Sequence, residues 1–452
     1  MDAAELDYRA RTRSGYLPPE LVSRLIERGH AEVVEAWAGR GEWFCAREWA
    51  RLLGERGQRP EALDVLAPYL ATGWWTAVEA TAELLEDWGR AEEAIELTRA
   101  RMLLGHPHAL ASYTRLLARH GRAGEAFDLL LPHVDDDSLA RVLVDVAAVA
   151  GRDDEAAALL EARIPAGHHR CDSPWCCRGL DTYTTIGLLA RVRERQGRVD
   201  EAIALLSALE SNSIDARDQL AGLLARHGRI EELRAYAAAE DHGRAARRLA
   251  VLLEERGDVE GAVAVYRQAA MATVARGHVA VHLAQLLARH GRSGDAIGVM
   301  RALADAPGGA EDWIVDTLCT LYADQGRPQD ALAYLDDLKA RRGTEEWELF
   351  WIRLPLMAAC DRVDEAIEQA QSHPEGGTPY AAAHVARTLA GAGRTEEAVT
   401  VLEQHAPTHH DDLAGYLIDL GRPNEAVAVL QQHGLQPLGH QSSPCWYDQP
   451  PF

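Results

Sequence analysis

The sequence LLARHGRAGEAFDLL, residues 116–130, returns twice more along the chain in nearly the same form. The other copies are LLARHGRIEELRAY at 223–236 and LLARHGRSGDAIGVM at 286–300. In each copy an apolar segment ends at a glycine, and a second amphipathic segment starts a few residues later. This order is typical of two helices joined by a tight turn, because glycine adopts the left-handed conformation after a helix end at little cost.

The turn glycine sets a period for most of the chain. Between Gly57 and Gly421 it recurs about every 33 residues, and Asp361 takes its place in one copy. No strand-like run interrupts the pattern. A repeat of this length predicts an all-α fold, an α-solenoid of about a dozen stacked antiparallel helix-turn-helix repeats.

Three further positions of the repeat have a physical role. In most copies an arginine follows the glycine, an acidic residue stands four residues after it and an alanine five after it, as in Arg122, Glu125 and Ala126. The acidic residue falls in the first turn of the second helix, where the helix dipole favours negative charge. The small alanine side chain lets the two helices of a pair approach closely.

The turn glycine, the alanine after it and a small residue seven positions before it, such as Ala221 before Gly228, resemble the tetratricopeptide repeat family. The resemblance covers nearly the whole chain, and it departs from the family where leucines such as Leu117 stand in place of an aromatic residue. It implies a right-handed superhelix of helix pairs. It also implies that the first helices line a concave groove that holds peptides or partner proteins.

The period divides the chain into three parts. We expect residues 1–20 to cap the first hairpin or to fray, residues 21–433 to form the solenoid, and residues 434–452 to form an irregular tail. The tail contains Trp446, Tyr447 and Phe452. It is interpreted as a loose extension, and the alternatives are a short linear motif or a segment that folds back into the groove.

An insertion rich in cysteine and histidine lengthens one repeat at residues 164–181. Thiolate and imidazole groups at these spacings suit a tetrahedral Zn²⁺ ion, which would supply a core that this polar loop lacks. The favoured interpretation is an ordered loop with reduced thiols; the alternatives are a structural zinc site and a redox-sensing thiol cluster. The candidate zinc ligands are His168, His169, Cys171, Cys176 and Cys177. No other cofactor is expected.

Charge and cysteine content exclude several classes of function. The chain has 47 Lys and Arg against 70 Asp and Glu, a net charge of −23, which disfavours a nucleic-acid partner and an anionic membrane surface. Seven cysteines in 452 residues are too few for a disulfide framework. With no apolar leader and no membrane-spanning run, we expect a cytoplasmic protein.

Catalytic motifs are absent from the sequence. It has no phosphate-binding loop, no nucleophile elbow and no HExxH motif. The recurring Arg–His pairs, such as Arg226 and His227, stand directly before turn glycines and are interpreted as helix C-terminal caps. We therefore expect that the protein is not an enzyme.

The resemblance places a set of arginines on the inward face of the first helices, six or ten residues before the turn glycine. Such a row could bind an acidic peptide or a C-terminal carboxylate through bidentate contacts. The alternative, given equal weight, is that these arginines pair with Glu79, Glu83, Asp145 and Asp218 in the same rows. The candidate groove residues are Arg47, Arg51, Arg115, Arg141, Arg191, Arg247 and Arg387.

These observations favour a non-catalytic scaffold or adaptor that binds a peptide or protein segment in its groove. The first alternative is a sensor or regulatory subunit of a signalling or transcription complex, in which ligand binding changes the curvature of the solenoid. Two further alternatives have less support. An RNA-binding helical array conflicts with the net charge, and a helical-barrel hydrolase lacks a carboxylate pair outside the repeat rows.

Overall fold

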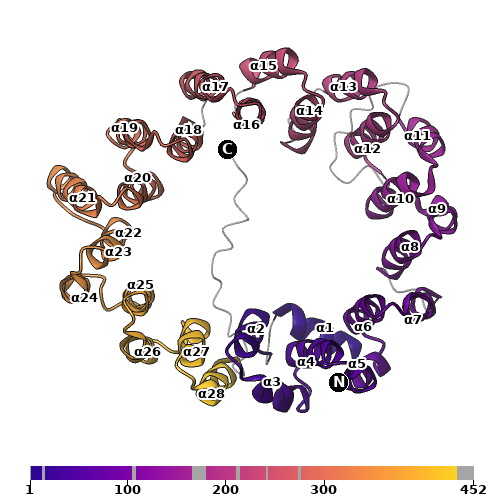
Figure 1. The fold of residues 1–452 in the computed structure, drawn as a ribbon, viewed down its shortest axis with the longest axis horizontal. Coiled ribbons are helices and arrows are strands. Elements are labelled where there is room, and N and C mark those ends of the chain that lie inside the picture. The colour runs from indigo at the N-terminus through magenta and orange to yellow at the C-terminus, as the bar shows by residue number, and fades with distance from the viewer. Residues whose placement is uncertain are drawn as a thin grey trace. The chain divides into compact units, whose positions relative to one another are not determined.

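The computed structural model describes residues 2–12, 16–103, 108–164, 180–209, 214–240, 243–272 and 276–434. Every element in these ranges is a helix, and none of the described residues forms a strand. Consecutive helices pack as hairpins joined by short turns (Figure 1). The predicted all-α solenoid of helix–turn–helix repeats is therefore confirmed. None of the described helices is long and apolar enough to cross a membrane.

The chain forms two compact units. Unit 1 contains both ends of the chain, Met1–Arg101 and Arg353–Phe452, and unit 2 contains Met102–Ile352. The N-terminal helices of unit 1 are α1 (Ala3–Thr12), α2 (Pro19–Glu27), α3 (Ala31–Ala38), α4 (Trp43–Glu55), α5 (Arg59–Ala71), α6 (Trp75–Asp87) and α7 (Ala91–Leu103). Its C-terminal helices are α23 (Arg353–Ala358), α24 (Val363–Ser372), α25 (Pro379–Gly391), α26 (Thr395–Glu403), α27 (His410–Asp419) and α28 (Pro423–Gly434).

Unit 2 is a single continuous run of hairpins. Its first half contains α8 (Ala109–Arg119), α9 (Ala123–Leu130), the 3-10 helix η1 (Leu131–His133), α10 (Asp137–Ala150), α11 (Asp153–Glu161), α12 (Thr182–Arg195), α13 (Val199–Ser207), α14 (Ile214–Arg226) and α15 (Ile230–Ala239). Its second half contains α16 (Arg244–Glu255), α17 (Val259–Ala272), α18 (Arg276–Arg289), α19 (Ser293–Ala304), α20 (Asp312–Asp324), α21 (Pro328–Arg342) and α22 (Trp347–Phe350).

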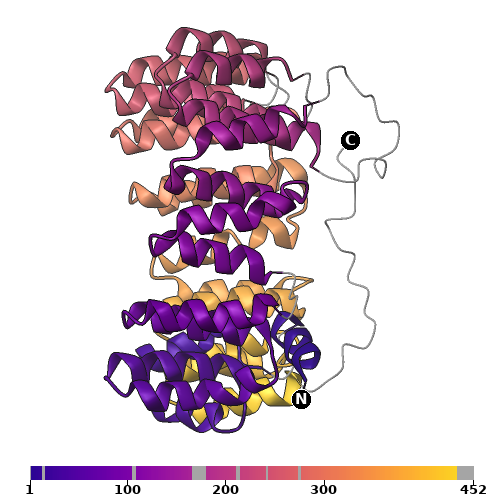
Figure 2. The same cartoon turned by 90° about the vertical axis from the view of Figure 1, so that its right-hand side faces the viewer.

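The hairpins of unit 2 form two layers. The first helices of successive hairpins contact one another, for example α8 with α10, α10 with α12 and α18 with α20. These first helices lie on the inner side of the curve that the hairpins of this unit follow, and the second helices lie outside them (Figure 1). Seen from the side, the hairpins are stacked with their helices side by side (Figure 2). The layer of first helices is thus the surface that any groove of this unit would use.

The repeat positions have the structural roles that their chemistry suggests. The turn glycines adopt positive φ, for example 78° at Gly121 and 74° at Gly291. Asp361, which replaces the glycine in one turn, has φ 58° and is the only residue other than glycine with a positive φ in the described part of the chain. The alanine five residues after the glycine is fully buried between helices, as at Ala126 and Ala296.

Within unit 1 the two ends of the chain pack against each other, α2 against α27. Arg24 Nε donates to Asp419 Oδ1 at 3.0 Å, and Arg28 Nη2 lies 2.8 Å from the same oxygen. Gly415 of α27 makes room for this contact, because a Cβ atom there would meet Arg24 Nη1 at 2.8 Å and Leu21 at 3.7 Å.

The predicted limits of the three parts of the chain stay predictions. The N-terminal segment contains α1, whose Leu6 is buried, and Trp74 Nε1 of the solenoid donates to Asp7 at 3.4 Å. Most of the predicted insertion, residues 165–179, and all of the predicted tail except Gly434 lie outside the described residues.

Candidate partner-binding surface

Most arginines of the repeat hold the hairpins together. The arginine that follows the turn glycine, or Asp361 in its place, pairs with the acidic residue three positions later in ten of the repeats. These pairs are Arg90–Glu93, Arg122–Glu125, Arg152–Glu155, Arg198–Glu201, Arg229–Glu232, Arg292–Asp295, Arg327–Asp330, Arg362–Glu365, Arg394–Glu397 and Arg422–Glu425. The sequence analysis placed this acidic residue in the first turn of the second helix because of the helix dipole. The structure shows that it is also the ion-pair partner of the arginine.

Several of these arginines reach a second acidic residue on the preceding second helix. Arg292 Nη2 lies 2.8 Å from Asp295 of its own hairpin, and its Nη1 lies 2.6 Å from Glu260 of α17. Arg152, Arg229, Arg394 and Arg422 make the same double contact. One guanidinium therefore links two neighbouring hairpins, and these arginines are engaged in the fold.

The Arg–His pairs before two turn glycines contact an acidic residue of the preceding repeat. Arg226 Nη2 lies 2.8 Å and His227 Nε2 lies 2.9 Å from the carboxylate of Glu194. Arg289 and His290 each lie 2.9 Å from the carboxylate of Glu254 in the same way. These residues stand at the C-terminal ends of α14 and α18, and their side chains also bind a carboxylate of the preceding repeat, a contact that the interpretation as helix caps did not include.

These contacts change the acidity of the glutamates that accept them. Hydrogen bonds from Arg226, and to a smaller extent from His227, lower the pKa of Glu194. Hydrogen bonds from Arg289 and His290 lower the pKa of Glu254 against the opposing effect of burial. Both glutamates are therefore charged at neutral pH and act as structural anions between repeats.

Four of the seven predicted groove arginines are already ion-paired. Arg47 lies 3.6 Å from Glu83, and Arg191 lies 2.7 Å from Asp145, two of the partners that the alternative interpretation proposed. Arg51 contacts Glu48 at 2.9 Å and also Glu55. Arg141 contacts Asp137 at 3.3 Å. The pairing alternative thus names the partners of Arg47 and Arg191, whereas Arg51 and Arg141 pair with acidic residues of their own helices that it did not name.

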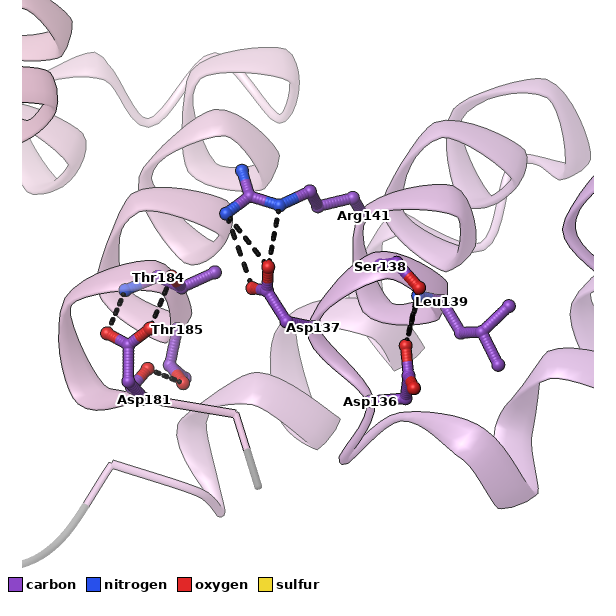
Figure 3. A network of polar contacts seen from close by, with 8 residues as sticks. All are labelled: Asp136, Asp137, Ser138, Leu139, Arg141, Asp181, Thr184 and Thr185. Atoms are coloured by element: carbon purple, nitrogen blue, oxygen red, sulfur yellow. Dashed lines mark hydrogen bonds and ion pairs between the residues drawn. The ribbon is translucent and has the colours of Figure 1, made fainter. Parts of the chain in front are cut away.

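Figure 3 shows the surroundings of Arg141 at the starts of α10 and α12. Its guanidinium bonds to Asp137, one turn earlier on the same helix. Two aspartates beside this pair are N-terminal caps: Asp136 accepts from the backbone N–H of Leu139 at 3.0 Å, and Asp181 accepts from that of Thr184 at 2.8 Å. The acidic side chains here are used by the helix starts and by Arg141.

The other three predicted arginines make no ion pair with any described residue. They are Arg115 of α8, Arg247 of α16 and Arg387 of α25, and all three are exposed. Arg115 and Arg247 belong to unit 2 and Arg387 belongs to unit 1. The structure therefore places the seven predicted residues on first helices of both units, and three of them have no acidic partner among the described residues.

On α17, α18 and α20 the structure brings together histidine and aromatic rings that the sequence analysis missed. The ring of His282 on α18 lies 6.3 Å from that of Tyr266 on α17, and the ring of His278 lies 5.0 Å from that of Trp313 on α20. Burial, followed by the nearby charges of Arg247, His278 and Arg289, lowers the pKa of His282. The two histidines stand four residues apart on one helix, a spacing that could have identified them as neighbours.

A second set of basic and aromatic groups lies around Arg387 in unit 1. Tyr380 and His384 of α25 pack edge to face at 4.8 Å, and His409 Nε2 donates to the carbonyl of Pro379 at 2.7 Å. Burial, Arg387 and His409 together lower the pKa of His384 to about 4. His384 is therefore neutral at physiological pH.

A cleft of about 410 Å³ lies in unit 1 between α3 and α28. On one wall the guanidinium of Arg40 stacks 4.5 Å from the ring centre of Trp37, and Val427 of α28 faces the cleft from the other wall. None of the groove arginines lines it. It is therefore separate from the predicted surface.

The candidate zinc ligands His168, His169, Cys171, Cys176 and Cys177 lie outside the described residues, so the zinc interpretation stays a prediction. Within the residues that the structure does describe, no group of three His, Cys, Asp or Glu side chains is arranged to hold a metal ion. Of the cysteines described, Cys45 and Cys319 are buried and Cys360 is partly exposed.

Comparison with known proteins gives no family or functional assignment. No protein-family model matches the chain, and no curated protein matches its sequence. Among solved structures it is similar to a Naa15/Naa10 complex bound to HypK-THB, with 12% identity, 92% of this chain and 79% of that chain covered, and a TM-score of 0.29. It is also similar to the pentatricopeptide repeat protein PPR10 from maize, with 17% identity, 91% and 67% covered, and a TM-score of 0.33. Both TM-scores lie below 0.5, so these likenesses carry no inference about function.

Proposed function

We propose that the protein is a non-catalytic scaffold of tetratricopeptide-repeat type that binds an acidic peptide or protein segment along its first helices. The observation that carries the proposal is that Arg115, Arg247 and Arg387 are exposed and make no ion pair with the described residues. The other four predicted groove arginines are paired with acidic side chains in this chain of 70 acidic against 47 basic Lys and Arg residues. Three free guanidinium groups on first helices are suited to bidentate binding of carboxylates from a partner.

The charge of the chain supports a protein partner over a nucleic acid. A net charge of −23 repels a phosphate backbone, and local arginines on an acidic surface select a short carboxylate-bearing segment instead. A cytoplasmic location and the lack of catalysis, both expected from the sequence, belong to the same proposal.

Peptide-display selection on the full-length protein tests this function. We expect the recovered peptides to be enriched in Asp and Glu and to bind more weakly as salt rises. Arg247→Glu should weaken a recovered peptide about tenfold or more, since a charge-assisted bond contributes about 1.5–3 kcal/mol.

Arg267→Glu is the matched control. Arg267 is exposed on α17, a second helix, and makes no ion pair with the described residues, so its reversal changes the net charge equally. Its effect should stay below about twofold. Recovery of peptides without acidic enrichment, or equal losses in the two variants, would contradict the proposed function.

A further inference from the structure

The cleft between α3 and α28 of unit 1 is a surface that the proposed function leaves unused. Its volume of about 410 Å³ is enough for a short peptide segment. One face of each helix lines it, because the lining residues on both sides recur at the spacing of successive helical turns. Ala36, Trp37 and Arg40 of α3 belong to one wall, and Val427 and Ala428 of α28 belong to the other.

The position of the cleft in the solenoid explains why it is open. Elsewhere a second helix packs against the first helix of the next hairpin, as α17 does against α18 and α19 against α20. No described hairpin follows α28. The N-terminal hairpin of unit 1 stands there instead: α2 packs against α27, and α3 lines the cleft opposite α28 (Figure 1). The cleft is thus a junction between two hairpins that their own side chains do not fill.

The surface of the cleft combines apolar groups with one cation that has no acidic partner among the described residues. The ring of Trp37 is partly exposed, and the alanines of both walls are exposed. The guanidinium of Arg40 lies 4.5 Å from the ring centre of Trp37 and makes no ion pair with a described residue. Glu32, the other charged residue of the lining, lies 3.8 Å from His30. An occupant with an aromatic ring next to a carboxylate would match both the apolar walls and the cation.

The chain itself supplies a segment of this chemistry beside the cleft. α28 ends at Gly434, only three residues after Gln431, which lines the cleft. Of residues 435–452, Asp448 alone is acidic and none is Lys or Arg. Asp448 directly follows Trp446 and Tyr447, so the segment places two aromatic rings next to its one acidic side chain.

The length of the chain after α28 allows this segment to reach the cleft. An extended chain spans up to about 3.3 Å per residue, so the fourteen residues from Gly434 to Asp448 can cover about 45 Å. α28 has 12 residues and is therefore about 18 Å long. A tether of this kind holds the segment at an effective concentration near the millimolar range, so that modest contacts suffice for binding.

We propose that the cleft binds the chain's own segment 444–452, with Asp448 paired to Arg40 and the rings of Trp446 and Tyr447 packed against Trp37 and the alanines of the two walls. The tether favours this occupant over a segment of another molecule. Three prolines within the segment restrict the unbound chain and lower the entropy lost on binding. The bound segment joins α3 to α28 beside the α2–α27 contact, a role that goes beyond the proposed function.

Disulfide trapping on the full-length protein tests where the segment binds. Cys445 precedes Trp446, and two cysteines form a disulfide when their Cα atoms come within about 4.4–6.8 Å. In Ala36→Cys the new thiol stands on the wall of the cleft opposite the tether. Its effective concentration for Cys445, measured against glutathione, should exceed that in Glu35→Cys about tenfold or more. Glu35 is exposed on the same helix and does not line the cleft, and peptide mass spectrometry identifies the linked cysteines.

Charge reversal tests the pairing with Asp448. In the Ala36→Cys background, Arg40→Glu should lower the effective concentration about threefold to fivefold, as expected for one exposed ion pair. Adding Asp448→Arg restores opposite charges and should recover the loss. The matched control is Arg56→Glu, because Arg56 is also exposed and lies over a tryptophan ring, 5.3 Å from the centre of Trp49, without lining the cleft. An equal loss in Arg56→Glu would contradict the pairing.

A peptide added in trans distinguishes the chain's own segment from other occupants. A fluorescein-labelled peptide of residues 444–452 should bind the double variant Trp446→Ala, Tyr447→Ala about tenfold more tightly than wild type, whose own segment fills the cleft. Equal binding to the two proteins, equal trapping in Ala36→Cys and Glu35→Cys, or a disulfide that links two chains would overturn the proposal. The acidic-peptide function is tested separately, because no groove arginine lines the cleft.

Discussion

Asp361 occupies the turn position that glycine holds in the other repeats. Its φ of 58° is left-handed, and its backbone N–H still bonds to the carbonyl of Ala358 at 3.0 Å, as in the glycine turns. Aspartate tolerates this conformation better than most residues, but its Cβ remains crowded there. The turn therefore keeps its left-handed conformation even without glycine. For this reason the spacing of the repeat was enough to assign Asp361 to the turn position from the sequence.

Replacing Asp361 with glycine should stabilise the protein. The gain is expected to reach about 1 kcal/mol, because relief of the left-handed strain exceeds the entropy that glycine loses on folding. Urea unfolding of Asp361→Gly against wild type measures it. Asp361→Ala provides the comparison and should destabilise, since alanine keeps the strain and loses the polar side chain; a glycine variant less stable than wild type would show that the aspartate side chain stabilises the turn.

At the scale of elements, charged groups and close packing join each hairpin to the next. The Arg–acid pairs after the turn glycines recur with the repeat, so the sequence indicates where they stand. Their second contacts, such as Arg292 with Glu260, depend on how one hairpin rests on its neighbour. Gly54 shows the same dependence: a Cβ there would lie 2.7 Å from the ring of Trp88 one hairpin later, a constraint with no signal in the repeat pattern.

The junction of Glu194 with Arg226 and His227 should give the protein a stability that depends on acid pH. The pKa of Glu194 is lowered in the folded state, so its contribution is fully present above the unfolded pKa of about 4.3 and is lost as the pH falls through the lower folded value. Glu194→Gln should cost about 1 kcal/mol or less at pH 7, since Arg226 is 59% exposed.

Urea unfolding at pH 7, 5 and 3 measures this junction. The difference between Glu194→Gln and wild type should shrink toward pH 3. Asp324→Asn is the control, because Asp324 is exposed and makes no ion pair within the described ranges. A cost for Glu194→Gln that stays constant with pH would show that the glutamate acts through packing instead of charge.

At the scale of the whole molecule, the repeat pattern predicted the elements but not every contact between them. Arg47–Glu83 and Arg191–Asp145 join adjacent repeats, so counting positions from the turn glycine was enough to propose both partners. Arg24 and Asp419 are 395 positions apart, and no local pattern links them. His278 and His282 were missed for a related reason: their rings contact Trp313 and Tyr266, which belong to other hairpins.

The α2–α27 contact of unit 1 leads to a separate prediction, because it joins two helices that lie far apart in the sequence. Asp419 is 21% exposed and faces both Arg24 and Arg28. Asp419→Arg would place three cations together, and the α2–α27 contact should open. Hydrogen exchange of α2 amides should then accelerate about tenfold or more, as expected for the loss of about 1.4 kcal/mol.

The matched control for this contact is Asp324→Arg. Asp324 stands at the same repeat position, two residues before its turn glycine, on α20 of unit 2. The two substitutions alter the net charge equally and differ only in the residues around them. Asp324→Arg should therefore leave the hydrogen exchange of α2 amides unchanged. Adding Arg24→Glu to Asp419→Arg restores opposite charges and should slow the exchange again. If Asp419→Arg leaves the hydrogen exchange of α2 amides unchanged, then apolar packing around Leu21 and Gly415 holds α2 against α27, and the ion pairs do not.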